Sequence, residues 1–480
     1  MDTTATGTAM LAAMATGEVS AVELTRAHLD AIAGPGAALN AVVVVDPEGA
    51  LAAAARVDAD RAAGRPLGRL AGLPVTVKDS VDAAGLPSSH GRAVDRRVAD
   101  VDAPTVRRLR AEGCVVLGKT NVPEWLASMH SANGLFGATV NPWDPTRSSG
   151  GSSGGASAAV AAGLAVTDLG SDLAGSLRVP ASWCGLFGHR PSNGAVSKLG
   201  NMPWPTGGLL EPLVSAIGPF ARSAADTALV SEVLFGADGL DAAGWQLHLP
   251  PARVTRLADA RVAVWTDDPD CPVDAETRAA VRGFADRLAD AGAVVTELTA
   301  PPVGGAVDLE LFQRLQAAEV VHGFSADDLA AMAVRAEAGD AVAARYGQSV
   351  WSALRDLEAQ RAATARWAAV FADVDVVLCP ATSRVATSYT PELTAPEHVA
   401  VDGRRLPIDT VSDWSRLSSL GRLPATVVPL GPGMRSGLPV GGQLLGAYLD
   451  DRTPLAVARL AEEAGLLRFV APPARSRAAL

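Results

Sequence analysis

The chain has 480 residues, 48% hydrophobic and 19% charged, so it can bury a large core and is not expected to be disordered. A formal net charge of −11 with no compensating basic run argues against nucleic acid as a partner. The N-terminus lacks a basic leader and no apolar stretch approaches the roughly 20 residues of a membrane span, so we expect a soluble, cytoplasmic protein.

Short apolar runs rich in β-branched residues alternate with helical stretches along the chain. The expected strands are AVVVV from Ala41, LPVTV from Leu73, CVVLG from Cys114, RVAVW from Arg261, AVVTEL from Ala293 and VDVVLCP from Val374. The expected helices include AVELTRAHLDAI, AETRAAVRGFADRLADAG and nearly all of residues 309–372. No long linker or internal repeat divides the chain. The pattern predicts one large α/β domain over residues 1–480 with a buried sheet.

The four cysteines are widely separated and form no Cys-x-x-Cys pair. They are Cys114, Cys184, Cys271 and Cys379, each in apolar surroundings. We therefore expect reduced core residues, with neither a zinc site nor a disulfide framework.

The run RSSGGSSGGASAAVAAG, from Arg147, partly matches the sequence motifs of two kinds of site. Ala156 stands where a phosphate-binding P-loop needs lysine. Gly150, Ser152 and Gly154 have the spacing of a nucleophile elbow, but the preceding TVNPWDPTRSS is not an apolar strand. A flexible linker is the simplest alternative. The alanine-rich helix expected directly afterwards favours a built site over a spacer.

Lysine is rare in this sequence. Only Lys78, Lys119 and Lys198 occur among 41 lysines and arginines, which leaves 41 − 3 = 38 arginines. Arginine cannot lose its proton at a workable pH, so a lysine in this chain is a candidate base. Lys78 ends the apolar run LPVTV, where burial would lower its pKa. A salt bridge or a contact at the edge of the core is an equal alternative for Lys78 and the favoured interpretation for the other two lysines.

A second turn of small residues, LGSDLAGSLRVPASWCG, supplies a candidate nucleophile. Residues 172–176 can present consecutive backbone N–H groups around Ser176, as an oxyanion hole requires. Ser176 follows Ser152 by 176 − 152 = 24 residues, with the alanine-rich helix between them. A helix and a returning strand would bring the two serines together beside Lys78.

In this order and spacing, LPVTVKDS, GGSSGGASAAVAAG and SDLAGSLRVPASWCG resemble the amidase signature family of serine hydrolases. Further similar blocks are LRAEGCVVLGKTNVPEW, NPWDP, VSAIGPFARSAADTA and GRLPATVVPLGPGMRSGLPVGGQLLG, so the resemblance covers about four-fifths of the chain. It implies a mixed β-sheet covered by helices on both faces, with the signature segment at about residues 72–230. The Gly/Ser run is then the loop that carries a relay serine.

The resemblance also implies residue roles. Ser176 would attack the amide carbonyl, Ser152 would relay its proton after a cis peptide bond at Gly151–Ser152, and Lys78 would be the base. The oxyanion-hole candidates are the backbone N–H groups of Leu173, Ala174, Gly175 and Ser176, with Asp172 and Arg178 bracing the turn. No cofactor or metal is implied. Ala174, Ser171 and Ser80 depart from the common residues of the family, and we expect them to alter the pocket rather than abolish catalysis.

Two histidines and four large apolar side chains are also candidates for roles at the site. His130 and His189 fall in the signature region, but neither has an obvious acid–base partner, and we expect both to be structural. Trp125, Met129, Trp204 and Trp414 can line a substrate pocket or equally belong to the core.

The sequence predicts an amidohydrolase that cleaves a carboxylic amide C–N bond through an acyl-enzyme. The expected partner is a small-molecule amide, with no nucleic acid or membrane; a homodimer is left open. The alternatives are the A subunit of a tRNA-dependent amidotransferase and an amide-forming acyltransferase. Two features argue against the amidotransferase: the net negative charge of the chain, and Ala216, which stands where such subunits often have an acidic or amide side chain. The substrate's identity is not indicated, because one fold serves many substrates.

Overall fold

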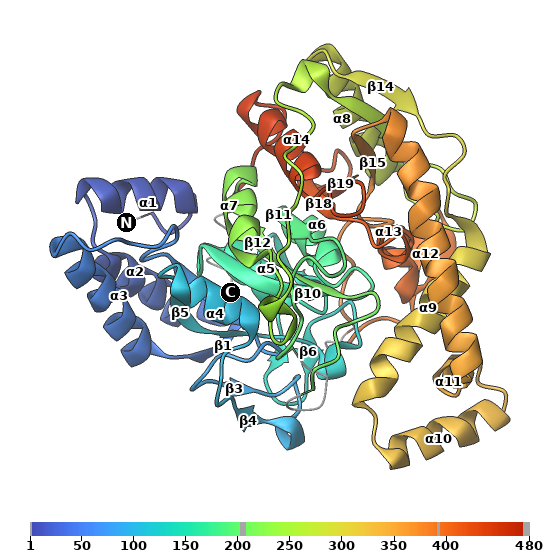
Figure 1. Cartoon of the computed structure of the whole chain (residues 1–480), viewed down its shortest axis with the longest axis horizontal. Coiled ribbons are helices and arrows are strands. Elements are labelled where there is room, and N and C mark those ends of the chain that lie inside the picture. The colour runs from blue at the N-terminus through green and yellow to red at the C-terminus, as the bar shows by residue number, and fades with distance from the viewer. Residues whose placement is uncertain (1, 202–207, 391–393, 474–480) are drawn as a thin grey trace.

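The protein is described as a computed structural model covering residues 2–201, 208–390 and 394–473. Within these ranges, eleven strands form one mixed sheet that runs through the molecule (Figure 1). In sheet order, the strands are β1 (Val42–Val45), β5 (Val115–Thr120), β2 (Pro74–Lys78), β10 (Thr167–Asp172), β12 (Ala216–Ala221), β11 (Phe187–Arg190), β18 (Ala425–Pro432), β19 (Pro439–Leu445), β15 (Val376–Pro380), β13 (Arg261–Val264) and β14 (Val294–Glu297). All six strands expected from apolar runs are present.

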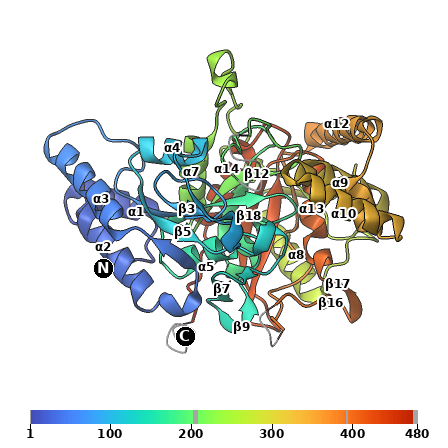
Figure 2. The same ribbon diagram turned by 90° about the horizontal axis from the view of Figure 1, so that it is seen from below.

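Helices cover both faces of this sheet, which confirms the expected α/β architecture (Figure 1). They are α1 (Gly7–Thr16), α2 (Ala21–Ala33), α3 (Pro47–Ala62), α4 (Pro104–Ala111), α5 (Gly154–Ala161), α6 (Arg178–Cys184), α7 (Ala224–Leu234), α8 (Ala275–Asp290), α9 (Gly305–Val320), α10 (Ala326–Glu337), α11 (Ala341–Tyr346), α12 (Val350–Asp373), α13 (Asp413–Leu420) and α14 (Arg452–Glu463). Figures 1 and 2 both place α1–α3 and α9–α12 at opposite ends of the molecule.

Short strands also form pairs within the loops around the sheet. In the described ranges the pairs are β3 (Pro87–Ser88) with β4 (Arg97–Val98), β6 (Ala132–Asn133) with β7 (Gly137–Ala138), β8 (Val140–Asn141) with β9 (Asp144–Ser148), and β16 (His398–Val401) with β17 (Arg404–Pro407). The pair β16–β17 lies in a stretch rich in Pro, Ser and Thr, at about residues 382–410, which follows the helical segment of residues 309–372.

Local sequence determines several of the helix ends. The α2 helix begins with a capping box, in which the Glu23 N–H donates to Ser20 Oγ at 3.1 Å and the Ser20 N–H donates to Glu23 Oε2 at 2.9 Å. The α5 helix follows the Gly/Ser run and is buried along its whole length. Only small side chains fit there, because a Cβ on Gly155 would lie 2.3 Å from the backbone nitrogen of Asn121.

The two parallel strands β2 and β10 position the candidate site. They pair in parallel, with Leu169 opposite Val77, so their carboxyl ends lie at the same edge of the sheet. Every residue of both strands is buried. The chain passes from the Gly/Ser run through α5 into β10, and this returning strand brings residues 171–176 back beside Lys78. The expected helix-and-strand connection between the two serines is therefore confirmed.

Candidate active site

Lys78 ends β2 and is completely buried. Its Nζ lies 2.7 Å from Ser152 Oγ, 2.8 Å from Ser153 Oγ and 2.9 Å from Ser171 Oγ. The pKa of Lys78 is lowered to about 7: burial is the main cause, the positive charge of Lys198 acts in the same direction, and the nearby aspartates oppose both effects. Among the residues that the structure describes, the ammonium group thus has hydroxyl partners but no carboxylate in contact, and its neutral form is accessible near neutral pH.

The Gly/Ser loop packs too tightly for side chains at its glycines. A Cβ on Gly151 would lie 2.3 Å from the carbonyl oxygen of Ser128. Gly150 has φ of +90°, and a Cβ there would lie 2.7 Å from Cα of Pro180. The peptide bond between Gly151 and Ser152 is cis, as expected. This close packing presents Ser152 Oγ to Lys78.

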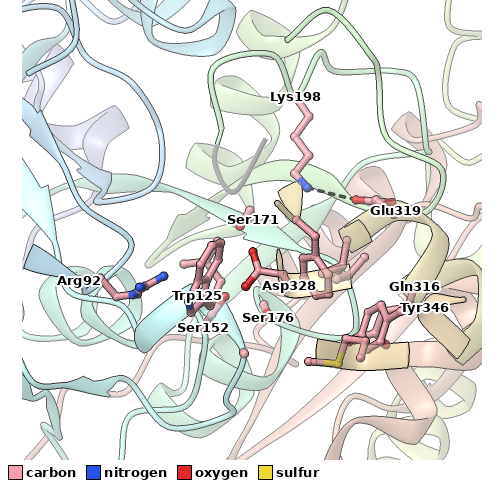
Figure 3. Close-up of a pocket in the computed structure, with 16 residues that line it drawn as sticks. Arg92, Trp125, Ser152, Ser171, Ser176, Lys198, Gln316, Glu319, Asp328 and Tyr346 are labelled. Atoms are coloured by element: carbon pink, nitrogen blue, oxygen red, sulfur yellow. Dashed lines mark hydrogen bonds and ion pairs between the residues drawn. The ribbon is translucent and has the colours of Figure 1, made fainter. Parts of the chain in front are cut away.

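Ser176 lies on the turn between β10 and α6. Its carbonyl oxygen accepts a hydrogen bond of 3.1 Å from the Ser153 N–H, which joins this turn to the Gly/Ser loop. The Ser176 side chain lines the same cavity as Ser152 and Ser171 (Figure 3). Ser152 and Ser176 therefore line one cavity, and Lys78 lies behind this lining in hydrogen-bond contact with Ser152.

The backbone donors of this turn are not equivalent. The Gly175 N–H donates to Asp172 Oδ1 at 3.0 Å, so it is the one predicted oxyanion donor that already has an acceptor within the described residues. The reason is that the Asp172 carboxylate folds back over the turn and also accepts the N–H groups of Leu177 and Arg178. Across residues 2–201, 208–390 and 394–473, the N–H groups of Leu173, Ala174 and Ser176 find no acceptor.

Asp172 and Arg178 form a completely buried, bidentate ion pair. Arg178 donates from Nη2 to Asp172 Oδ1 at 2.8 Å and from Nε to Oδ2 at 2.9 Å. Burial opposes the charged carboxylate, but the Arg178 guanidinium outweighs it and holds the pKa of Asp172 below its ordinary range. Arg178 Nη2 also donates to Ser419 Oγ at 2.6 Å. This geometry can brace the turn, as predicted for both residues.

The cavity above the serines has a volume of about 420 Å³. It is lined by Arg92, Trp125, Leu126, Ala127, Ser152, Ser171, Leu173, Ser176, Lys198, Gln316, Glu319, Val320, Phe324, Asp328, Met332 and Tyr346 (Figure 3). Apolar and aromatic side chains provide much of this lining, as in small-molecule sites. Residues 316–346 belong to α9–α11 and the short connection between α9 and α10, so a distant part of the sequence closes the cavity.

Of the four predicted pocket residues, Trp125 lines this cavity. Met129 is instead buried in a cluster with Val179 and Trp183, and Trp414 is completely buried, 4.9 Å from Trp265 between ring centroids. For these two, the core alternative is the correct one, because each is enclosed by apolar side chains away from the cavity. Trp204 lies outside the described residues.

Sequence reasoning did not single out Ser153, or assign Ser171 a contact with Lys78. Ser153 directly follows Ser152 in the Gly/Ser run, and Ser171 precedes Asp172 at the end of β10, so both could have been found by proximity to the motifs. The cavity residues of α9–α11 had no comparable signal, since a helical sequence does not show which distant loop it faces.

The other lysines and the two histidines have structural contacts. Lys119 Nζ donates to the carbonyl oxygens of Asp79 at 2.9 Å and Val81 at 2.7 Å. Lys198 Nζ lies 3.2 Å from Glu319 Oε1, the ion pair drawn in Figure 3. His189 contacts Thr426 and Asp451, and His130 contacts Thr387. Lys198 therefore makes the salt bridge expected of it, whereas within the described residues Lys119 makes buried contacts with carbonyl groups and no salt bridge.

The four cysteines are buried, as expected for core residues. Among the described residues, no cluster of three or more His, Cys, Asp or Glu side chains is placed to hold a metal ion. No helix in the same ranges combines the length and apolarity needed to span a membrane.

Comparison with known proteins identifies the family. The family profile described as Amidase matches residues 23–455. The indoleacetamide hydrolase of Bradyrhizobium diazoefficiens is 35% identical over 95% of this chain and 86% of its own length. The A subunit of the glutamyl-tRNA(Gln) amidotransferase from a Synechococcus species is 32% identical over 93% of this chain and 94% of its own. The native peptide amidase of Stenotrophomonas maltophilia has a TM-score of 0.75 at 27% identity, covering 97% of both chains. The chain belongs to the amidase signature family.

Proposed function

We propose that this protein is an amidohydrolase that cleaves a carboxylic amide C–N bond through a Ser176 acyl-enzyme. The observation that carries the proposal is the 2.7 Å contact between Lys78 Nζ and Ser152 Oγ, on the floor of a cavity that Ser176 also lines. A buried lysine with an accessible neutral form, a bridging hydroxyl and a second serine are the parts of a base–relay–nucleophile set.

In the first half-reaction, neutral Lys78 accepts the proton of Ser152, and Ser152 accepts that of Ser176 as Ser176 Oγ bonds to the carbonyl carbon. The negative charge that develops on the carbonyl oxygen meets N–H donors already in place, for which Leu173, Ala174 and Ser176 are the candidates. Collapse of the tetrahedral intermediate breaks the C–N bond, and the leaving nitrogen takes the proton back through Ser152.

In the second half-reaction, water attacks the Ser176 ester. Ser152 and Lys78 take the water's proton by the same route, and the proton returns to Ser176 Oγ when the acid leaves. Each step uses a group of this chain or water, so the proposal needs no cofactor. The partner it requires is a small-molecule amide.

The proposal is tested by two measurements on the wild-type protein. A fluorophosphonate probe should label Ser176, located by peptide mass spectrometry. A panel of primary amides, anilides and carbamates should then give ammonia or amine release that the probe blocks. Labelling of a different serine, or release that continues after complete labelling, would contradict the proposed nucleophile.

A second candidate is the A subunit of a tRNA-dependent amidotransferase, favoured by the 32% identity to the Synechococcus protein over nearly the whole of both chains. That function predicts glutamine as the amide and a need for companion subunits. Hydrolysis of other amides by the isolated chain, without stimulation by companion subunits, would favour the amidohydrolase. An acyltransferase would instead pass the acyl group to added hydroxylamine in preference to water.

A further inference from the structure

The cavity has two aromatic walls from different parts of the chain. One wall contains Trp125, which is 36% exposed. The other contains Phe324 and Tyr346, whose ring centroids are 5.0 Å apart. In the view of Figure 3, Ser176 lies between Trp125 and Tyr346. A planar group attached to an amide over Ser176 would lie in a cavity that both sets of rings line.

Trp125 is held in place by its neighbours. The ring of His90 stacks against it with centroids 6.3 Å apart and an interplanar angle of 27°. The Arg92 guanidinium lies 4.6 Å from the Trp125 ring centroid. The backbone N–H of Trp125 donates to the His90 carbonyl oxygen at 3.0 Å. The indole is thus a positioned flat surface rather than a side chain free to fold into the cavity.

The charged groups of the cavity already have partners of the opposite charge or hydrogen-bond donors. Lys198 pairs with Glu319, and Arg92 Nη1 lies 3.2 Å from Asp95 Oδ2. Asp328 Oδ2 accepts the N–H and hydroxyl of Ser325 at 2.9 and 2.7 Å. A charged substrate would lose water without gaining a dedicated counter-charge, and at the cavity wall it would meet both Arg92 and Asp328. The lining therefore favours a neutral substrate.

Two neutral polar side chains of the cavity stand apart from this pattern. Within the part of the chain that the structure describes, neither the Gln316 amide nor the Tyr346 hydroxyl makes a hydrogen bond, although both side chains are half-buried and line the cavity. The chain's other two tyrosines differ, because Tyr389 donates to the Thr139 carbonyl at 2.7 Å and Tyr448 donates to the Asn193 carbonyl at 3.2 Å.

We propose that Gln316 and Tyr346 recognise a neutral hydrogen-bonding group on the ring of an aromatic amide substrate held between Trp125 and the Phe324–Tyr346 pair. This inference rests on the proposed amide hydrolysis and adds the class of substrate. A donor or acceptor on the ring would supply the partner that these side chains lack, while the ring fills the apolar space. Both residues would be specificity-determining rather than catalytic.

The test compares kcat/KM for four primary amides: phenylacetamide, 4-hydroxyphenylacetamide, 4-carboxyphenylacetamide and hexanamide. We expect both neutral aromatic amides to exceed hexanamide, and the hydroxylated ring to exceed the plain ring by about three- to tenfold, the value of one neutral hydrogen bond. The carboxylate should be at least about tenfold poorer than the plain ring, because its charge is buried unpaired. A carboxylate or aliphatic amide that equals the best substrate would overturn the inference.

Two variants assign the recognition to residues. Tyr346→Phe and Gln316→Leu remove polar atoms with little change of shape, and together they should reduce the hydroxyl preference to about one. Tyr448→Phe is the matched control, because it removes a hydroxyl outside the cavity and should leave the preference unchanged. A preference that persists in the double variant would overturn the assignment. Failure of the proposed function would look different, since all four amides would remain intact and Ser176 would resist fluorophosphonate labelling.

Discussion

Lys78 and Ser152 come from segments 74 residues apart, yet Lys78 Nζ and Ser152 Oγ are separated by 2.7 Å in a buried site. The pairing depends on two features of the fold: β2 ends at Lys78, and the Gly/Ser loop reaches that strand end because its glycines permit close packing. A lysine held by hydroxyls, with no carboxylate of the described ranges in contact, can change its protonation state near neutral pH.

Activity is expected to depend on the neutral form of Lys78. Burial lowers its pKa to about 7, so kcat/KM should rise as pH increases through 7 and level off above it. Lys78→Arg keeps the positive charge but has no neutral form, and Lys78→Ala has no base at all. Both should lose about 10² to 10⁴ in kcat/KM. The measurement is kcat/KM from pH 6 to 10, with circular dichroism to establish folding; an arginine variant within about fivefold of wild type would refute the base assignment.

Ser176→Ala should abolish turnover and covalent labelling while leaving the fold intact. The hydroxyl is small, and the contact that joins the two loops uses the Ser176 carbonyl oxygen, which the variant retains. Ser128→Ala is the control, because Ser128 Oγ accepts only the His130 N–H within the described residues and does not line the cavity. The measurements on both variants are turnover, covalent labelling by the fluorophosphonate probe, and thermal melts. Turnover by the Ser176→Ala protein would exclude Ser176 as the nucleophile.

Gly151→Ala should damage both stability and activity. The added Cβ would lie 2.3 Å from the Ser128 carbonyl oxygen, so the loop that carries Ser152 must shift. We expect a cost on the order of 1–3 kcal/mol in the free energy of unfolding, with a loss of kcat. At Gly244 a Cβ has open space, and Gly244→Ala should change neither quantity. Denaturant unfolding and steady-state kinetics on both variants test this; a Gly151→Ala protein with wild-type values would show that the loop accommodates the methyl group.

The strands and the site floor could be predicted from sequence because their signals are local. LPVTV is apolar enough to be a buried strand, and the lysine that follows it is conspicuous in a chain with only three lysines. The helix and strand between Ser152 and Ser176 follow from composition. The hydrogen bond from the Gly175 N–H to the carboxylate of Asp172, three residues earlier, could not be predicted, because it depends on the turn's conformation.

The cavity wall that α9–α11 form could not be predicted, for a different physical reason. Residues 309–372 are helical in sequence, but the face that meets the serines depends on how α9–α11 pack across the sheet edge. Trp414 has the size and chemistry of a pocket residue, yet it is enclosed with Trp265 and Trp367 in the core. Side-chain type alone does not distinguish a ring that lines a cavity from one that fills an apolar core.

Activity should survive prolonged treatment with EDTA. The proposed stabilisation of the oxyanion comes from backbone N–H groups, and the proposed base is a lysine, so no step needs a Lewis acid. The assay is kcat/KM before and after dialysis against chelator, with thermal melts to detect any loss of folding. Loss of activity that zinc restores, with the fold unchanged, would contradict the mechanism.

The charges around Lys78 should move the pH profile in opposite directions. Lys198 lowers the pKa of Lys78, whereas Asp172, Asp168 and Asp79 raise it. Lys198→Met removes a positive charge, which stabilises the protonated form of Lys78 and raises its pKa. The acidic limb of kcat/KM should therefore move to higher pH. At pH 7 this variant should be less active than wild type, and the deficit should disappear as pH rises.

Asp168→Asn supplies the control of opposite sign. Thr76 and Thr120 donate to Asp168 Oδ2 at 2.6 and 3.0 Å, and an asparagine oxygen can keep these bonds while losing the negative charge. Burial raises the pKa of Asp168 to about 7, so its charge is only partly present on the acidic limb and the expected shift is small. The acidic limb should then move to lower pH, because the protonated form of Lys78 has lost a favourable neighbour. If the acidic limbs of the two variants shift in the same direction, or if neither shifts, these charges do not set the ionisation that controls activity.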